Sequence, residues 1–113
     1  MRIEVRGRNV EVSDELRDAV VSRFKRVGKQ VSELATLEIE LIEEKNPSIR
    51  EKCVAEATLF LKGATLRAKD ASESMTHTVN LVADELARQV KRHRDKRRGR
   101  RESTRVEPRP AEG

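Results

Sequence analysis

Apolar and polar residues alternate over residues 2–7, where Ile3 and Val5 stand between charged neighbours, and this is the period of a half-buried β-strand. Ser13 follows as a candidate helix N-cap, with two acidic residues directly after it in the first turn. Five apolar residues then repeat at helical spacing within an arc of ~80°. They are Leu16, Val20, Phe24, Val27 and Val31. The pattern predicts one strand followed by one amphipathic helix.

Three further strands are predicted in the middle of the chain. Apolar residues alternate with glutamates in residues 37–42, and small or apolar residues occupy the odd positions of residues 52–61. Lys62 and Gly63 form a two-residue connection that suits a β-hairpin, because glycine readily adopts the positive φ that such turns require. A fourth strand, residues 64–69, is therefore expected to pair antiparallel with the third.

A second helix is predicted after Ser72 and Ser74, either of which can serve as its N-cap. Five apolar residues form one face of this helix. They are Met75, Val79, Val82, Leu86 and Val90. Because the apolar face ends at Val90, we expect the helix to continue for only one or two turns as a basic extension past the domain. Gly99 and the two prolines that follow it argue against further regular structure.

The element order β-α-β-β-β-α predicts an α+β fold, in which a four-stranded sheet carries both helices on one face. The chain has 113 residues, so we expect one globular domain over residues 1–98 and a flexible, basic, proline-containing tail or linker over residues 99–113. One cysteine allows no intramolecular disulfide, and no apolar run approaches the ~20 residues of a membrane span. No basic segment followed by an apolar run opens the chain. We therefore expect a cytoplasmic protein that does not enter a membrane.

The positive charge of the chain is concentrated in residues 88–101. This segment holds nine of the 25 Lys and Arg residues and one acid, which gives it a charge of +8. Residues 1–87 carry a net −2 and residues 102–113 a net −1, so the formal total is +5. A local concentration of this kind attracts polyanions, and nucleic acid is the first partner that it indicates.

The residues that could support catalysis or bind a metal do not form a convincing group. Cys53 lies on the inward face of a predicted strand without a nearby histidine, which is typical of a structural cysteine. Neither histidine has a Cys or carboxylate at metal-ligand spacing. The pairs Glu38/Glu40 and Glu43/Glu44 could act as acids or bind Mg²⁺, but we interpret them as the solvent side of an edge strand. We predict a protein that is not an enzyme and that uses no metal, cofactor or small-molecule substrate.

The composition also restricts the mode of nucleic-acid binding. The chain has no Trp or Tyr and only two Phe, so an aromatic platform for base stacking is not expected. Charges on helices contact phosphates and recognise overall shape, which favours structured RNA over a specific DNA sequence. The alternative is that the basic segment is only a solvated or non-specific polyanion-binding tail.

Three separated segments resemble one known family. They are VEVSDELRDAVVSRFKRV (residues 10–27), AEATLFLKGATLRAKD (residues 55–70) and LARQVKRHRDK (residues 86–96). Their order and spacing are similar to those of the ribosome hibernation-promoting factors, also called ribosome-associated inhibitors or Y-type factors. The resemblance covers residues 1 to about 98.

The resemblance implies a fold similar to a double-stranded-RNA-binding domain and a role in translation during starvation or stationary phase. Family members insert into the small ribosomal subunit, cover 16S rRNA at the decoding region and block tRNA and mRNA. The implied partners are therefore the 30S subunit and the 70S ribosome. The RNA-binding positions of the family correspond to Arg17, Arg23 and Arg26 in the first helix and to Arg88, Arg92, Arg94 and Lys96 in the second. Neighbouring cations complete the predicted set: Lys25, Lys29, Lys91, Arg97 and Arg98.

This chain departs from the family pattern at the second helix. Ser74-Met75-Thr76 stands where members commonly carry Asp-Met-Tyr, and Asn80 replaces a frequent Asp. Long-form members also have a C-terminal dimerisation domain, for which 113 residues leave no room, so the chain is interpreted as a short form or a fragment ending in the linker. A competing hypothesis is a regulator of transcription that binds an acidic protein partner, because family members have been described as sigma-factor modulators.

Overall fold

The computed structural model describes the backbone of residues 1–106 and the side chains of residues 1–96. The described part contains four strands and three helices. In chain order these are β1 (Arg2–Arg8), α1 (Asp14–Arg23), α2 (Lys25–Gly28), β2 (Thr36–Glu43), β3 (Cys53–Leu61), β4 (Ala64–Ser72) and α3 (Met75–Val106).

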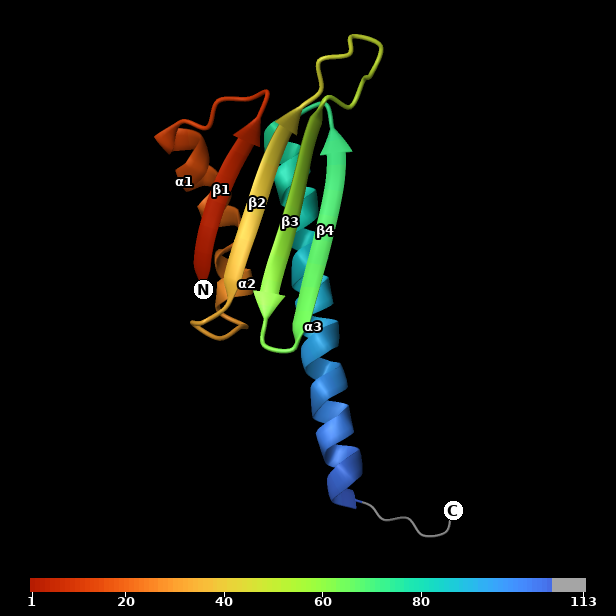
Figure 1. Cartoon of the computed structure of the whole chain (residues 1–113). Coiled ribbons are helices and arrows are strands. Elements are labelled where there is room, and N and C mark those ends of the chain that lie inside the picture. Colours follow the sequence, from red (N-terminus) through yellow and green to blue (C-terminus); the bar gives the residue numbers. More distant parts are fainter. Residues whose placement is uncertain (107–113) are drawn as a thin grey trace.

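The strands form one mixed sheet in the order β1-β2-β3-β4. β1 and β2 are parallel because α1 and α2 form the crossover between them, whereas the other neighbours are antiparallel. Figure 1 shows the helices on one side of the sheet. The prediction of an α+β fold with its helices on one face is therefore confirmed.

The hydrophobic core lies between the sheet and the helices. The strand register places Ile3 beside Leu37 and Leu37 beside Leu59, so these apolar side chains share the helix-facing side. The helical side contributes Phe24, between α1 and α2, and Leu86 in α3, both completely buried. Burial of such a side chain stabilises the fold by roughly 1.5–3 kcal/mol relative to its exposure.

The first predicted helix is two helices, α1 and α2, separated at Phe24. Ser13 caps α1 as expected, since its side chain accepts a hydrogen bond from the Leu16 N–H at 3.1 Å. Phe24 has φ −100° and ψ 6°, outside the α-helical region, and Val31 lies beyond the end of α2. Phe24 and Val27 are nevertheless both buried, so the break leaves these two residues on the core-facing side that their spacing predicted.

The interpretation of β2 as an edge strand is wrong, because β2 lies between β1 and β3. Glu38 is on the open face of the sheet, where the Arg6 Nη2 atom lies 3.6 Å from its carboxylate. The alternation of polar and apolar residues determines which face a side chain occupies, but not which strands are neighbours. The predicted hairpin at Lys62 and Gly63 is confirmed, with Gly63 at φ 80°.

α3 extends further than the sequence predicted. It continues through Gly99 to Val106, whereas we expected an end one or two turns after Val90. A single glycine costs a helix only about 1 kcal/mol, and its Arg, Lys and Glu neighbours favour helix. Figure 1 shows the basic end of α3 projecting past the sheet, as predicted. Pro108 and Pro110 lie outside the described residues.

Candidate nucleic-acid interface

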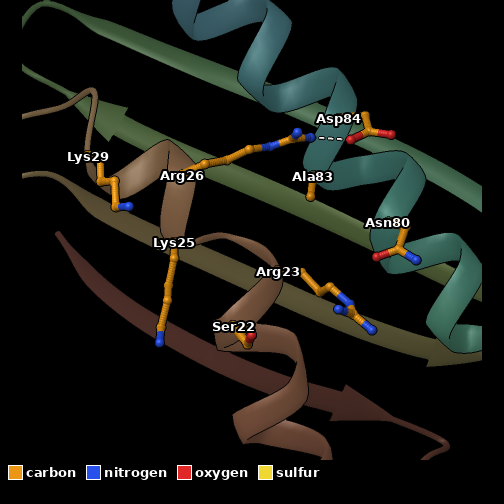
Figure 2. A pocket seen from close by; sticks show the side chains of 8 residues that line it. All are labelled: Ser22, Arg23, Lys25, Arg26, Lys29, Asn80, Ala83 and Asp84. Carbon is orange, nitrogen blue, oxygen red and sulfur yellow. Dashed lines mark hydrogen bonds and ion pairs between the residues drawn. The ribbon is translucent and has the colours of Figure 1, made fainter.

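A hollow of about 550 Å³ lies between the two short helices and α3 (Figure 2). Four of its lining side chains are cationic, and all four come from the end of α1, from α2 and from the residue that follows it. The complete lining is Ser22, Arg23, Lys25, Arg26, Lys29, Asn80, Ala83 and Asp84.

A second hollow of about 340 Å³ continues along α3 toward its basic end. Its lining adds three cations from α3. The complete lining is Arg26, Gln30, Asp84, Ala87, Arg88, Lys91 and Arg94. Because Arg26 and Asp84 line both hollows, the two form one surface, which we call the helical cleft.

An ion pair between Arg26 and Asp84 crosses the helical cleft from α2 to α3 (Figure 2). The Arg26 side chain is 52 % exposed and the Asp84 side chain 54 % exposed. An exposed pair of this kind contributes only about 0.2–1 kcal/mol to stability. The main effect of the ion pair is therefore to hold the Arg26 guanidinium in one position in the helical cleft.

Glu85 orients two further arginines on α3. Its carboxylate lies 2.9 Å from the Arg88 Nη2 atom and 3.6 Å from the Arg92 Nη2 atom. The Gln89 side-chain amide also donates a hydrogen bond to Glu85, at 3.1 Å. The hydrogen bond from Arg88, followed by that from Gln89, lowers the pKa of the Glu85 carboxyl. Glu85 therefore remains charged near neutral pH and favours one arrangement of its arginine partners.

The start of α3 is attached to the sheet by a buried hydroxyl. Thr78 is completely buried and donates a hydrogen bond to the Cys53 carbonyl oxygen at 2.8 Å. Its oxygen also lies 2.6 Å from the Ser72 hydroxyl, at the end of β4. The helix cap is Ser74, whose side chain accepts a hydrogen bond from the His77 N–H at 3.3 Å. These contacts fix the direction of α3 and so the α3 wall of the helical cleft.

Thr76, which departs from the family pattern, lines a small hollow of about 50 Å³ between α1 and α3. Leu16, Met75 and Arg23 are among the residues that line it with Thr76. Asn80 lies one turn further along α3 and lines the helical cleft. Both departures are therefore at the junction of α1 with α3.

The structure brings together most of the residues that the sequence predicted for RNA binding. Seven of them line the helical cleft: Arg23, Lys25, Arg26, Lys29, Arg88, Lys91 and Arg94. Arg92 is held by Glu85, and Arg17 and Lys96 are exposed outside both hollows. Arg97 and Arg98 lie beyond the described side chains. RNA binding by any of these residues stays a prediction.

The sequence interpretation missed the uncharged and acidic residues of the helical cleft. Ser22, Gln30 and Asp84 line it but were not predicted, and Asn80 was considered only as a departure from the family. A helical projection could have placed Asn80, Asp84 and Lys91 on one face of α3. It could not have shown that α2 packs opposite that face.

The described residues contain no group of three or more potential metal ligands. Cys53 is half-buried, and its thiol donates a long hydrogen bond, 3.7 Å, to the Glu73 carbonyl oxygen. Burial raises the pKa of this thiol, and the neighbouring Glu43 carboxylate adds to the effect. A thiol with a raised pKa is a weak nucleophile near neutral pH. In the described part of the chain, no helix is both long enough and apolar enough to cross a bilayer.

The fold and the helical cleft together define a class: small α+β domains with a cation-rich helical side. Comparison with known proteins identifies the family within this class. Residues 3–98 match the family described as sigma 54 modulation protein / S30EA ribosomal protein. The chain therefore belongs to this family, and the resemblance identified from the sequence is confirmed.

Individual relatives agree with this assignment. A ribosome hibernation promotion factor of Picosynechococcus sp. is 30% identical over 100 residues, which cover 88% of this chain and 52% of the relative. A ribosome hibernation promoting factor of Pseudomonas putida is 31% identical over 96 residues, which cover 85% of this chain and 89% of the relative. The chain thus spans about half of the first relative and nearly all of the second.

Solved structures share the fold. The N-terminal domain of Protein Y from Thermus thermophilus has a TM-score of 0.71 and 25% sequence identity, covering 82% of this chain and 99% of that domain. A ribosomal subunit interface protein from Coxiella burnetii has a TM-score of 0.70 at 23% identity, covering 84% of this chain and 99% of that one. The second likeness is evidence for the fold alone.

Proposed function

We propose that this protein is a ribosome hibernation factor that binds 16S rRNA at the decoding region of the small subunit. In that position it blocks the binding of tRNA and mRNA, and so inhibits translation during starvation or stationary phase. The names of the relatives support ribosome hibernation. The observation that carries the RNA-binding part is the helical cleft, where cations from the two short helices face cations from α3.

The physical basis of the proposed binding is a set of charges held on folded elements. α2 and the part of α3 that lines the helical cleft are helical before binding, so less conformational entropy is lost when their side chains contact phosphates. Each contact releases counterions from the RNA and adds to the affinity. Inhibition by occupying a site requires no chemical step.

Occupancy can be tested in a cell-free translation system. We expect inhibition to require about one molecule per ribosome, to be reversed by a high-salt wash, and to be relieved when initiator tRNA and mRNA are loaded first. Substoichiometric inhibition with cleaved or modified 16S rRNA would contradict the occupancy mechanism. Tight binding in the presence of tRNA in the A and P sites would contradict the proposed position.

A second candidate function follows from the description of the family, which also names sigma 54 modulation. In this case the cations of the helical cleft would contact an acidic protein surface involved in transcription. Affinity purification of the protein from stationary-phase cells separates the two proposals. Recovery with 30S and 70S particles supports ribosome hibernation, and recovery with RNA polymerase but without ribosomes supports transcriptional regulation.

A further inference from the structure

The centre of the helical cleft differs from its two sides in charge. One side carries Arg23, Lys25 and Lys29, and the other side carries Arg88, Lys91 and Arg94. Between them lies the pair formed by Arg26 and Asp84, whose charges compensate each other. The helical cleft therefore consists of two groups of three cations separated by a nearly neutral centre that contains a carboxylate.

On the basis of the proposed RNA binding, we infer that Asp84 determines the selectivity of the helical cleft. It favours folded RNA that presents two separate backbone segments, and it disfavours a single polyanionic strand. A phosphate at the centre would approach the Asp84 carboxylate, and juxtaposed like charges oppose association. Phosphates are therefore directed to the two flanking groups of cations.

The shape of folded RNA matches this division of charge. Two backbone segments on either side of an RNA groove place their phosphates in two rows, with sugars and base edges between them. A single strand that crosses the helical cleft from one group of cations to the other has to bring a phosphate over or next to the centre. Asp84 therefore penalises the single strand more than the folded RNA.

Asp84 can also make a favourable contact with RNA. Arg26 donates its hydrogen bond to the Oδ1 atom of Asp84, which lines the helical cleft, so the Oδ2 atom of this carboxylate can still accept a hydrogen bond. Ribose 2′-hydroxyl groups are donors found in RNA and absent from DNA. Asn80, one turn earlier on α3, supplies amide donors and an acceptor beside Asp84 in the same hollow.

The test compares Asp84→Asn with Asp95→Asn in the full chain. Both variants remove one negative charge from α3, but Asp95 is exposed and outside both hollows. Binding is measured by fluorescence anisotropy to a duplex RNA of about 16 base pairs. A uridine single strand with the same number of phosphates serves as the second probe, and heparin as the third. Circular dichroism verifies that both variants are folded.

We expect Asp84→Asn to bind the single strand and heparin about three times more tightly, whereas the affinity for duplex RNA changes less, so that the preference for duplex falls. Asp95→Asn should strengthen binding to all three probes equally and keep the wild-type preference. An unchanged preference in Asp84→Asn, or an equal loss in Asp95→Asn, would overturn the role of Asp84 while leaving RNA binding intact. If the wild-type protein binds none of the probes and no ribosomes, the proposed function and this inference are both wrong.

Discussion

At the scale of single residues, Gly7 lies where the chain leaves β1 and passes close to itself. A Cβ atom at this position would lie 2.3 Å from the Val10 carbonyl oxygen and 2.8 Å from a methyl carbon of Val12. Contacts this short require the backbone to move, because the first atom belongs to the main chain. The sequence shows a glycine at this position, and only the folded loop shows that a methyl group has no space there.

We therefore expect Gly7→Ala to lower the free energy of unfolding by about 1–3 kcal/mol, as overpacking generally does. The control is Gly28→Ala at the end of α2, where the Cβ would lie 3.3 Å from the flexible end of Met1. Chemical denaturation measures both variants. A loss of stability in Gly28→Ala as large as in Gly7→Ala would contradict the explanation from steric contact.

Thr78 offers a second test at this scale, because its buried hydroxyl connects α3 to β3 and β4. Thr78→Val keeps the shape of the side chain but removes the hydroxyl donor of the Cys53 carbonyl oxygen. We expect the free energy of unfolding to fall by about 1–3 kcal/mol, the cost of unsatisfied buried polar groups. The matched control is Thr76→Val, two residues earlier and exposed, for which we expect no more than about 0.5 kcal/mol of change. Urea denaturation that ranks the two variants in the opposite order would show that the hydroxyl network is not what holds α3.

At the scale of elements, α3 has two parts with different surroundings. Its first half buries Val82 and Leu86 against the sheet and forms one wall of the helical cleft. Its second half projects beyond the sheet (Figure 1). Arg88 is therefore placed in the helical cleft by the packing of the first half, and Lys91 and Arg94 follow it within two turns.

This difference predicts unequal roles for the cations of α3. Changing Arg88, Arg92 and Arg94 to Glu should abolish ribosome binding, because charges fixed near the helical cleft are replaced by repulsive ones. Truncation after Arg98, which removes four further arginines, should only weaken binding. Co-sedimentation with 30S and 70S particles measures both effects.

A control for the triple variant keeps its change in net charge. Arg8, Lys62 and Arg67 are exposed, and none lines the helical cleft. Their replacement by Glu should reduce binding far less than the change on α3. If truncation eliminates binding while the triple change on α3 leaves it intact, binding resides in the extension and not in the folded domain.

At the scale of the whole molecule, the distribution of charge predicts how ribosome binding responds to salt. The two sides of the helical cleft supply six cations, and each phosphate that one of them neutralises adds about −0.7 to −0.9 to the slope of log affinity against log salt. Six contacts give a slope of about −4 to −5. Filter binding to 30S subunits at several salt concentrations measures the slope, and a value near zero would remove the electrostatic basis of the proposal.

Local periodicity was sufficient to predict most elements and the side of the sheet on which each apolar residue lies. A strand places alternate residues on opposite faces, and a helix repeats a face every three to four residues, so residues such as Ile39 and Leu86 could be assigned to the core before any packing was known. The hairpin at Gly63 and the cap at Ser13 were also predictable, because their chemistry involves only neighbouring residues. The seven cations that line the helical cleft had been selected from charge and family resemblance, since both are properties of the sequence.

Tertiary structure decided the features that depend on residues distant in the chain. The break at Phe24 is not visible in the apolar spacing, which continues through it, and the central position of β2 results from the crossover that places β1 on the side away from β3. Arg26 and Asp84 are 58 positions apart, so no local pattern could pair them across the helical cleft. Periodicity and local charge can be recognised from residues that are close together in the sequence. The shape of a cleft and the partner of each charge arise only when separate elements pack against one another.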